Sequence, residues 1–161
     1  MINEIAEHKY LIQPGYIIIY KEPAMIYGVV GSGIFLSIWD QHKEYSGCCS
    51  FQLPLCPSQK KGSPQYANVA IRYLIKKMRD NGSNLHDLKA LMLGGATQNT
   101  DKTGEQNIHI TKEILEKFKI EIITADNGGR LGRKFVYYTN SAQLITLKTR
   151  KLRKSDWYPY N

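Results

Sequence analysis

The 161-residue chain has no apolar run near the roughly 18 to 20 residues that a membrane-spanning helix requires. Its N-terminus carries Glu4, Glu7 and His8 in place of the basic and then apolar segments of a secretory signal. We therefore expect a cytoplasmic protein that does not insert into a membrane.

Cysteine is scarce, and its placement excludes two common roles. Cys48, Cys49 and Cys56 are an odd number within one segment, and the adjacent Cys48 and Cys49 are poorly placed to bridge each other. This argues against a disulfide scaffold and fits a reducing compartment. There is no Cys-x-x-Cys spacing, and His42 and His86 lie in unrelated contexts, so no metal site is predicted. No other cofactor is expected.

Acidic residues are too few to balance the basic ones. The chain has 14 Asp and Glu against 22 Lys and Arg, a formal net charge of +8, which favours an acidic partner such as protein, nucleic acid or anionic lipid. Basic residues gather near the C-terminus, namely Lys148, Arg150, Lys151, Arg153 and Lys154. This cluster is typical of a solvated tail or edge strand, and a nucleic-acid-binding module is the alternative.

Internal repeats and low-complexity segments are also absent. The length and the 42% hydrophobic content suit one globular unit, so we expect a single domain over residues 1–161. Its core would span about residues 11–150. Residues 151–161 would form a tail whose aromatic side chains fold back or meet a partner.

Strands dominate the first half of the predicted structure. β-branched and aromatic runs predict strands over residues 16–20 and 34–39, and a third over 45–53 after a polar hairpin connection at 40–44. Residues 55–64 are rich in turn formers and predict an exposed loop. Later strands are expected at residues 88–93, 120–125, 135–139 and 144–147, and the last two are expected to pair across a tight turn at Asn140 and Ser141.

Two amphipathic helices complete the pattern. The first is predicted to be capped by Ser63, to have Pro64 at its first position and to end at Gly82. The second is predicted to begin with a capping box formed by Thr103 and Gln106. Strands followed by alternating helices and strands indicate an α+β, layered α/β fold, with both helices packed on a mixed sheet.

Several glycine-rich segments follow one another in a specific order. Gly28, Gly31 and Gly33 do not match a phosphate loop, because their spacing differs and a strand rather than a helix follows. The other segments are Phe51-Gln52-Leu53-Pro54, Gly94-Gly95-Ala96, Gly104-Glu105-Gln106-Asn107 and residues 126–134. With Gly31-Ser32-Gly33, these five segments resemble the motifs of the CheD family over about residues 11–150.

The resemblance implies a fold and an activity. CheD proteins convert particular glutamines of chemoreceptors to glutamates, and they bind the CheC-type phosphatase that acts on the phosphorylated response regulator. Their chemistry uses a cysteine thiolate as nucleophile and a histidine as general base. The expected partners of this chain are therefore a chemoreceptor cytoplasmic domain or a CheC-type phosphatase.

The catalytic positions of that family hold other residues here. The cysteine position is Gly33, the histidine position is Ser50, and a supporting threonine position falls on Tyr27. Gly31, Ser32 and Gln52 would line the site by the same resemblance. Since Gly33 has no side chain and Ser50 is not basic near neutral pH, we expect a catalytically degenerate protein that acts by binding.

A surrogate nucleophile is the alternative that keeps the activity. Strand alternation predicts that Cys48 lies on the same face as Ser50 and Cys49 on the opposite face. Cys48 is therefore the substitute to test, although no histidine lies nearby in sequence to lower its pKa. His42 and His109 have no motif that supports a catalytic role.

Overall fold

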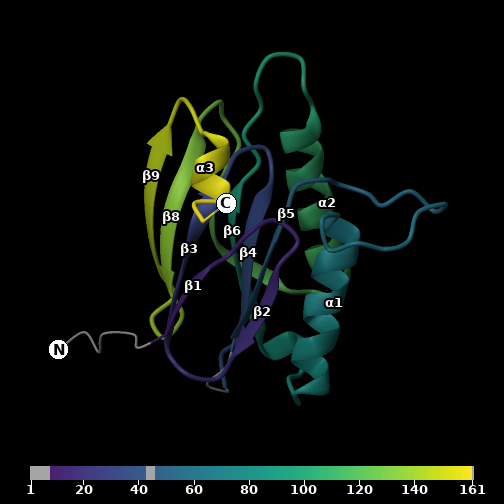
Figure 1. Ribbon diagram of the computed structural model, residues 1–161. Coiled ribbons are helices and arrows are strands. Elements are labelled where there is room, and N and C mark those ends of the chain that lie inside the picture. Colours follow the sequence, from purple (N-terminus) through teal and green to yellow (C-terminus); the bar gives the residue numbers. More distant parts are fainter. Residues whose placement is uncertain (1–7, 43–45, 161) are drawn as a thin grey trace.

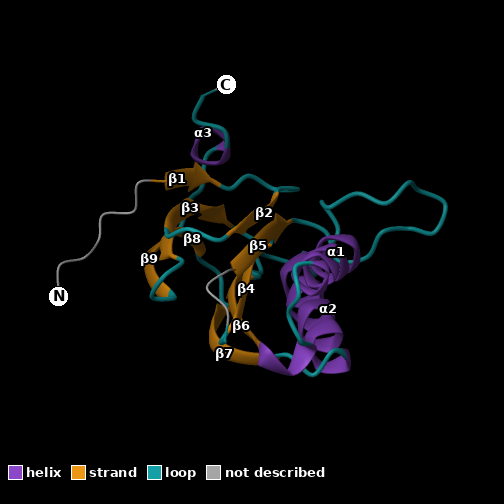
Figure 2. Cartoon of the chain, turned by 90° about the horizontal axis from the view of Figure 1, so that it is seen from below, coloured by secondary structure: helices purple, strands orange, loops and turns teal. Residues whose placement is uncertain are grey.

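The computed structural model describes residues 8–42 and 46–160. Two β-sheets pack face to face, and two long helices cover the outer face of one sheet (Figures 1 and 2). This confirms the expected layered α+β fold with two main helices on a mixed sheet. The predicted hairpin connection at 40–44 lies partly outside the described residues.

The five-stranded sheet is the central layer, with strand order β2-β5-β4-β6-β7. Its strands are β2 (Ile17–Tyr20), β4 (Ile34–Asp40), β5 (Ser46–Phe51), β6 (Leu88–Gly94) and β7 (Glu121–Asn127). The pairs are antiparallel except β6 with β7, which are parallel and are joined through a helix. The central strands are buried on both faces, which fits their continuous apolar sequences.

The four-stranded sheet has the order β1-β3-β8-β9. It consists of β1 (His8–Leu11), β3 (Ala24–Val30), β8 (Gly132–Tyr138) and β9 (Gln143–Thr149). Strands β8 and β9 form the hairpin that the turn at Asn140 and Ser141 predicted. One face of this sheet packs on the five-stranded sheet, and Ile145 and Leu147 are exposed on the other.

The helices are α1 (Ala67–Asp80), α2 (Thr103–Lys117) and the short α3 (Lys154–Trp157), with a 3-10 turn at Leu85–Asp87. Gly82 follows the end of α1 with a positive φ of 98°, as the sequence predicted. Helix α3 forms within the segment that was expected to be a tail, and it packs against β3 (Figure 1).

Both predicted helix starts were wrong in detail. Helix α1 begins at Ala67, because the Gln65 carbonyl accepts backbone hydrogen bonds from Gln52 and Leu53 and Tyr66 has an extended backbone. Ser63 and Pro64 therefore lie before the helix. Helix α2 has Thr103 as its first residue, without the predicted capping box.

Two apolar cores separate the three layers. Side chains of α1 and α2 pack on one face of the five-stranded sheet, together with Cys49 and Phe51. Cys48 lies on the other face of β5, in the core between the two sheets with Phe35 and Tyr137. The predicted alternation of Cys48 and Cys49 is thus confirmed. Strand alternation places Ser50 on the same face as Cys48.

Candidate functional site

The glycine-rich motifs, far apart in sequence, meet at one end of the central sheet. The N–H of Gly95 donates to the Gly33 carbonyl at 2.8 Å, and the N–H of Ala96 donates to the Gly31 carbonyl at 2.9 Å. The N–H of Gly128 donates to the Gly94 carbonyl at 2.9 Å. These backbone bonds join the ends of β6 and β7 to the segment that precedes β4.

Close backbone approach explains why two of these motif positions are glycine. A Cβ on Gly94 would collide with the carbonyl oxygen of Gly33, and Gly94 also has a positive φ of 120°. A Cβ on Gly104, at the start of α2, would collide with the carbonyl of Ala96. The motif glycines therefore serve the packing of this end of the fold.

Asn107 holds the two strand ends of the site together. Its side-chain amide donates to the Ser32 carbonyl at 2.8 Å and to the Gln52 carbonyl at 2.9 Å. The side chain is fully buried, and the hydroxyl of Thr111 donates to the Asn107 carbonyl. The motif contained Asn107, but no role could be assigned to it from sequence because its partners lie 55 and 75 residues away.

Arg133 organises the loop of residues 126–134. It is 2% exposed, and its guanidinium donates to the Asp126 carboxylate at 3.1 Å and to the carbonyls of Gly128 and Leu131. Burial acts to raise the pKa of Asp126, but the hydrogen bonds and charges of Arg133 and Lys148 outweigh it and lower that pKa below its usual value.

The two positions that the resemblance assigns to the catalytic cysteine and histidine line one small cavity. Gly33 and Ser50 both line a space of about 40 Å³, together with Gly31, Ser32 and Gln52. A Cβ added to Gly33 would collide with the carbonyl oxygen of Phe51. The backbone of β5 therefore occupies the space that a side chain at position 33 would need.

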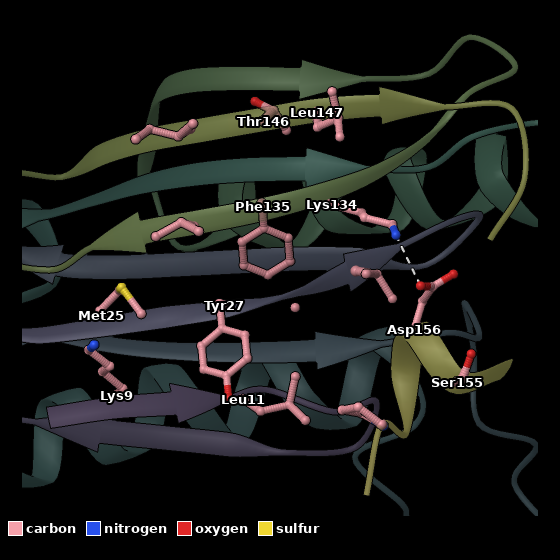
Figure 3. Close-up of a pocket in the computed structure, with 15 residues that line it drawn as sticks. Lys9, Leu11, Met25, Tyr27, Lys134, Phe135, Thr146, Leu147, Ser155 and Asp156 are labelled. Atoms are coloured by element: carbon pink, nitrogen blue, oxygen red, sulfur yellow. Dashed lines mark hydrogen bonds and ion pairs between the residues drawn. The ribbon is translucent and has the colours of Figure 1, made fainter. Parts of the chain in front are cut away.

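Tyr27 lies away from these residues. Its side chain is on the outer face of the four-stranded sheet, near Leu11 and Met25 (Figure 3). A hydrogen bond with Tyr160 raises its pKa. Tyr27 is not one of the described residues that line the cavity beside Gly33 and Ser50.

Cys48 is enclosed between the sheets. It is fully buried, and burial raises the pKa of its thiol, an effect that a hydrogen bond with Tyr20 only partly offsets. Nearby, the Ser37 hydroxyl donates to Tyr137 at 3.0 Å. A buried thiol of raised pKa has little of the thiolate that nucleophilic attack requires.

The four histidines are exposed and distant from the site. Each lies within ion-pair distance of a carboxylate: His8 with Glu22, His42 and His86 with Asp87, and His109 with Glu113. No cysteine or histidine of the described chain lines the small cavity or the larger cleft beside it.

The larger cleft, of about 530 Å³, opens next to the small cavity. The C-terminal segment forms one wall of it, and the Trp157 side chain lines both spaces. Leu152 and Trp157 lie against Gly31, 3.8 and 3.7 Å from a Cβ built there. The Lys134 ammonium and the Asp156 carboxylate, 3.0 Å apart, fix α3 to β8 (Figure 3).

Two kinds of feature are missing from residues 8–42 and 46–160. No group of three or more His, Cys, Asp or Glu side chains could hold a metal ion there. No helix in these residues is long and apolar enough to cross a membrane.

Comparison with known proteins identifies the family. The sequence model described as CheD chemotactic sensory transduction matches residues 53–148. The chain is 34% identical to the probable chemoreceptor glutamine deamidase CheD of Sulfurimonas denitrificans, over 86% of this chain and 92% of that protein. The chain belongs to the CheD family.

Other CheD relatives come from distant organisms. The probable chemoreceptor glutamine deamidase CheD of Trichlorobacter lovleyi is 31% identical over 85% of this chain and 88% of its own length. The protein of the same name from Methanococcus maripaludis is 28% identical over 88% and 96%. The CheD model match begins at Leu53, so Gly33 and Ser50 lie outside it.

Proposed function

We propose that this CheD-family protein binds a chemoreceptor cytoplasmic domain without deamidating it. The observation that carries the proposal is the contact between position 33 and Phe51. The carbonyl oxygen of Phe51 lies too close to the position that a Cβ on Gly33 would take. Glutamine deamidation of the family's kind needs a thiolate at that point, and this backbone has neither the thiol nor the space for one.

The general base is missing as well. Ser50 lines the small cavity at the family's histidine position, and a serine hydroxyl does not accept a proton near neutral pH. All four histidines are exposed elsewhere, next to carboxylates. The nucleophile and the base are therefore absent together.

A surrogate reaction through Cys48 is disfavoured by its surroundings. The thiol is fully buried between the sheets, and its pKa is raised. A receptor glutamine could reach it only if the two sheets separated. The cysteine is better explained as a small apolar residue of the core.

The arrangement of the motif segments around the cleft supports a role in binding. The motif segments keep their mutual hydrogen bonds around the open cleft, so recognition can persist where the chemistry does not. The net charge of +8 suits an acidic protein partner in the cytoplasm. A CheC-type phosphatase is the second candidate partner.

Nucleic-acid binding through residues 148–154 is the competing function. It has less support, because Lys148 pairs with Asp126 and the side chains of Arg150 and Lys151 line the cleft. Binding to random duplex DNA that falls steeply with salt would favour it. We expect no such binding at moderate ionic strength.

Co-purification tests the proposal. The chain is immobilised and offered a chemoreceptor cytoplasmic fragment, a CheC-type phosphatase and random duplex DNA in separate tubes, and every receptor glutamine is scored by peptide mass spectrometry afterwards. The proposal expects receptor retention with all glutamines intact. Conversion of any glutamine, or failure to retain the receptor, contradicts it.

A further inference from the structure

The cleft beside Gly33 and Ser50 carries an excess of positive charge. Its lining combines the motif residues Ser32 and Gln52 with the C-terminal residues Arg150 and Lys151. Both cations are exposed, and in the described part of the chain neither is within ion-pair distance of a carboxylate. The cleft thus presents two uncompensated positive charges to a ligand.

Asp101 is the acidic residue in the lining of this cleft. Its carboxylate accepts a hydrogen bond from the backbone N–H of Thr103 at 2.9 Å, at the start of α2. Hydrogen bonds from Thr103 lower the pKa of Asp101, so it stays ionised. Even with this charge included, positive groups outnumber negative ones in the cleft.

We infer that this cleft binds glutamate side chains, the product of the family's reaction, in preference to glutamine. This rests on the proposed receptor-binding function and states its specificity. A guanidinium and an ammonium donate to a carboxylate in charge-assisted hydrogen bonds, whereas a neutral carboxamide gains less and brings its own N–H donors towards two cations. The hydroxyl of Ser32, which also lines the cleft, supplies a further donor.

Loss of catalysis makes such a preference tolerable. An enzyme whose cleft binds the product more tightly than the substrate is inhibited as its product accumulates. That penalty disappears when no reaction takes place at position 33. The protein would then report how far a receptor has been deamidated.

The C-terminal segment is held firmly enough to place these charges. Leu152 lies against Gly132, where it would meet an added Cβ at 2.6 Å, and against Gly31. The Thr149 hydroxyl donates to the Lys151 carbonyl at 3.1 Å. Arg150 and Lys151 therefore extend from an ordered backbone beside the motif residues.

Matched receptor fragments test the inference. One chemoreceptor cytoplasmic fragment is prepared with glutamine at every modification site and again with glutamate, and the dissociation constants for the full chain are measured by calorimetry. We expect about tenfold tighter binding of the glutamate form, or ~1.4 kcal/mol, declining as salt is added. Equal or tighter binding of the glutamine form overturns the inference and leaves the receptor-binding function standing.

Two double variants of equal charge make the test specific. Arg150→Gln with Lys151→Gln removes both cleft cations, and we expect the two receptor forms then to bind equally. Arg72→Gln with Lys112→Gln removes the same charges from α1 and α2, and the preference should remain. Loss of the preference in both variants would indicate a general charge effect and overturn the site. Failure of the unaltered chain to bind either form would overturn the receptor-binding function itself.

Discussion

The carbonyl oxygen of Phe51 lies so close to Gly33 that it would collide with the Cβ of any other residue at position 33. Phe51 pairs with Ile34 in the β4–β5 ladder, so its carbonyl cannot move without disturbing two central strands. In the proposed function, the absence of a cysteine at position 33 is therefore coupled to the position of this backbone. Replacing one side chain would not recover the family's site.

Gly33→Ala tests this contact through stability. We expect a loss of about 1–3 kcal/mol in the free energy of unfolding, because the added methyl group must displace buried backbone. Gly31→Ala is the matched control, since a Cβ there has its nearest contact at 3.7 Å, with Trp157. The two free energies come from urea denaturation, and equal losses would show that position 33 is not crowded.

Restoring the catalytic pair should not restore catalysis. The double variant Gly33→Cys, Ser50→His supplies both side chains, but the Phe51 carbonyl would force the thiol out of line with the imidazole. We expect no receptor deamidation above the blank, by peptide mass spectrometry. Rapid conversion by this variant would mean that the backbone adjusts readily.

Asn107→Asp should weaken the whole motif cluster. The change removes the two N–H donors that bind the Ser32 and Gln52 carbonyls, and it buries a carboxylate. We therefore expect the free energy of unfolding to fall by roughly 2–4 kcal/mol. Gln106→Glu makes the same chemical change on an exposed neighbour and should alter stability little. Thermal denaturation of both variants distinguishes a clamp from a general effect of charge.

Thiol reactivity reports the burial of the cysteines. Cys48 and Cys49 are fully buried with raised pKa values, whereas Cys56 is only half-buried, in the loop before α1. Iodoacetamide near neutral pH should therefore modify Cys56 alone in the folded protein and all three in denaturant. Fast labelling of Cys48 in the folded chain, seen in its tryptic peptide, would reopen the surrogate mechanism.

Asp126 should make the free energy of unfolding depend on pH in the acidic range. Its folded pKa is depressed, so its contribution is present above the unfolded pKa of about 3.9 and is lost as the pH falls through the lower folded value. Asp126→Asn should destabilise the protein at neutral pH, and the difference from the unaltered chain should shrink below about pH 4. Urea denaturation at neutral pH and below about pH 4 measures the difference in the free energy of unfolding between the two proteins. A difference that stays constant would show that the carboxylate charge is unimportant.

The sequence predicted most of the central layers, because their residues carry strong local patterns. Residues 34–39 are rich in β-branched and aromatic side chains, which predicts β4. Strand alternation alone separated Cys48 from Cys49. Strand β1, by contrast, is mostly exposed and has little pattern, and α3 depends on contacts of Leu152 and Trp157 with distant glycines. The predicted start of α1 was wrong because it also depends on a distant segment: the Gln65 carbonyl accepts hydrogen bonds from Gln52 and Leu53, just after β5.

The sequence predicted the candidate site only through the resemblance to the family. That resemblance assigns Gly33 and Ser50 to the catalytic positions from the motif residues that flank them. The obstruction by Phe51, the clamp of Asn107 and the charges of Arg150 and Lys151 require segments far apart in sequence to meet. Tyr27 was assigned from the resemblance to the family, and the structure places it on the outer face of the other sheet.

The most direct test of the account compares this chain with a relative that is named as a probable deamidase, on one substrate. A chemoreceptor fragment with glutamine at its modification sites is incubated with excess chain and, in parallel, with the Sulfurimonas denitrificans protein as positive control. Peptide mass spectrometry follows glutamate formation over time. The account predicts conversion by the relative and none by this chain, although the chain binds the fragment. Glutamate formation by this chain, abolished by Cys48→Ser, would contradict the central claim and identify the nucleophile.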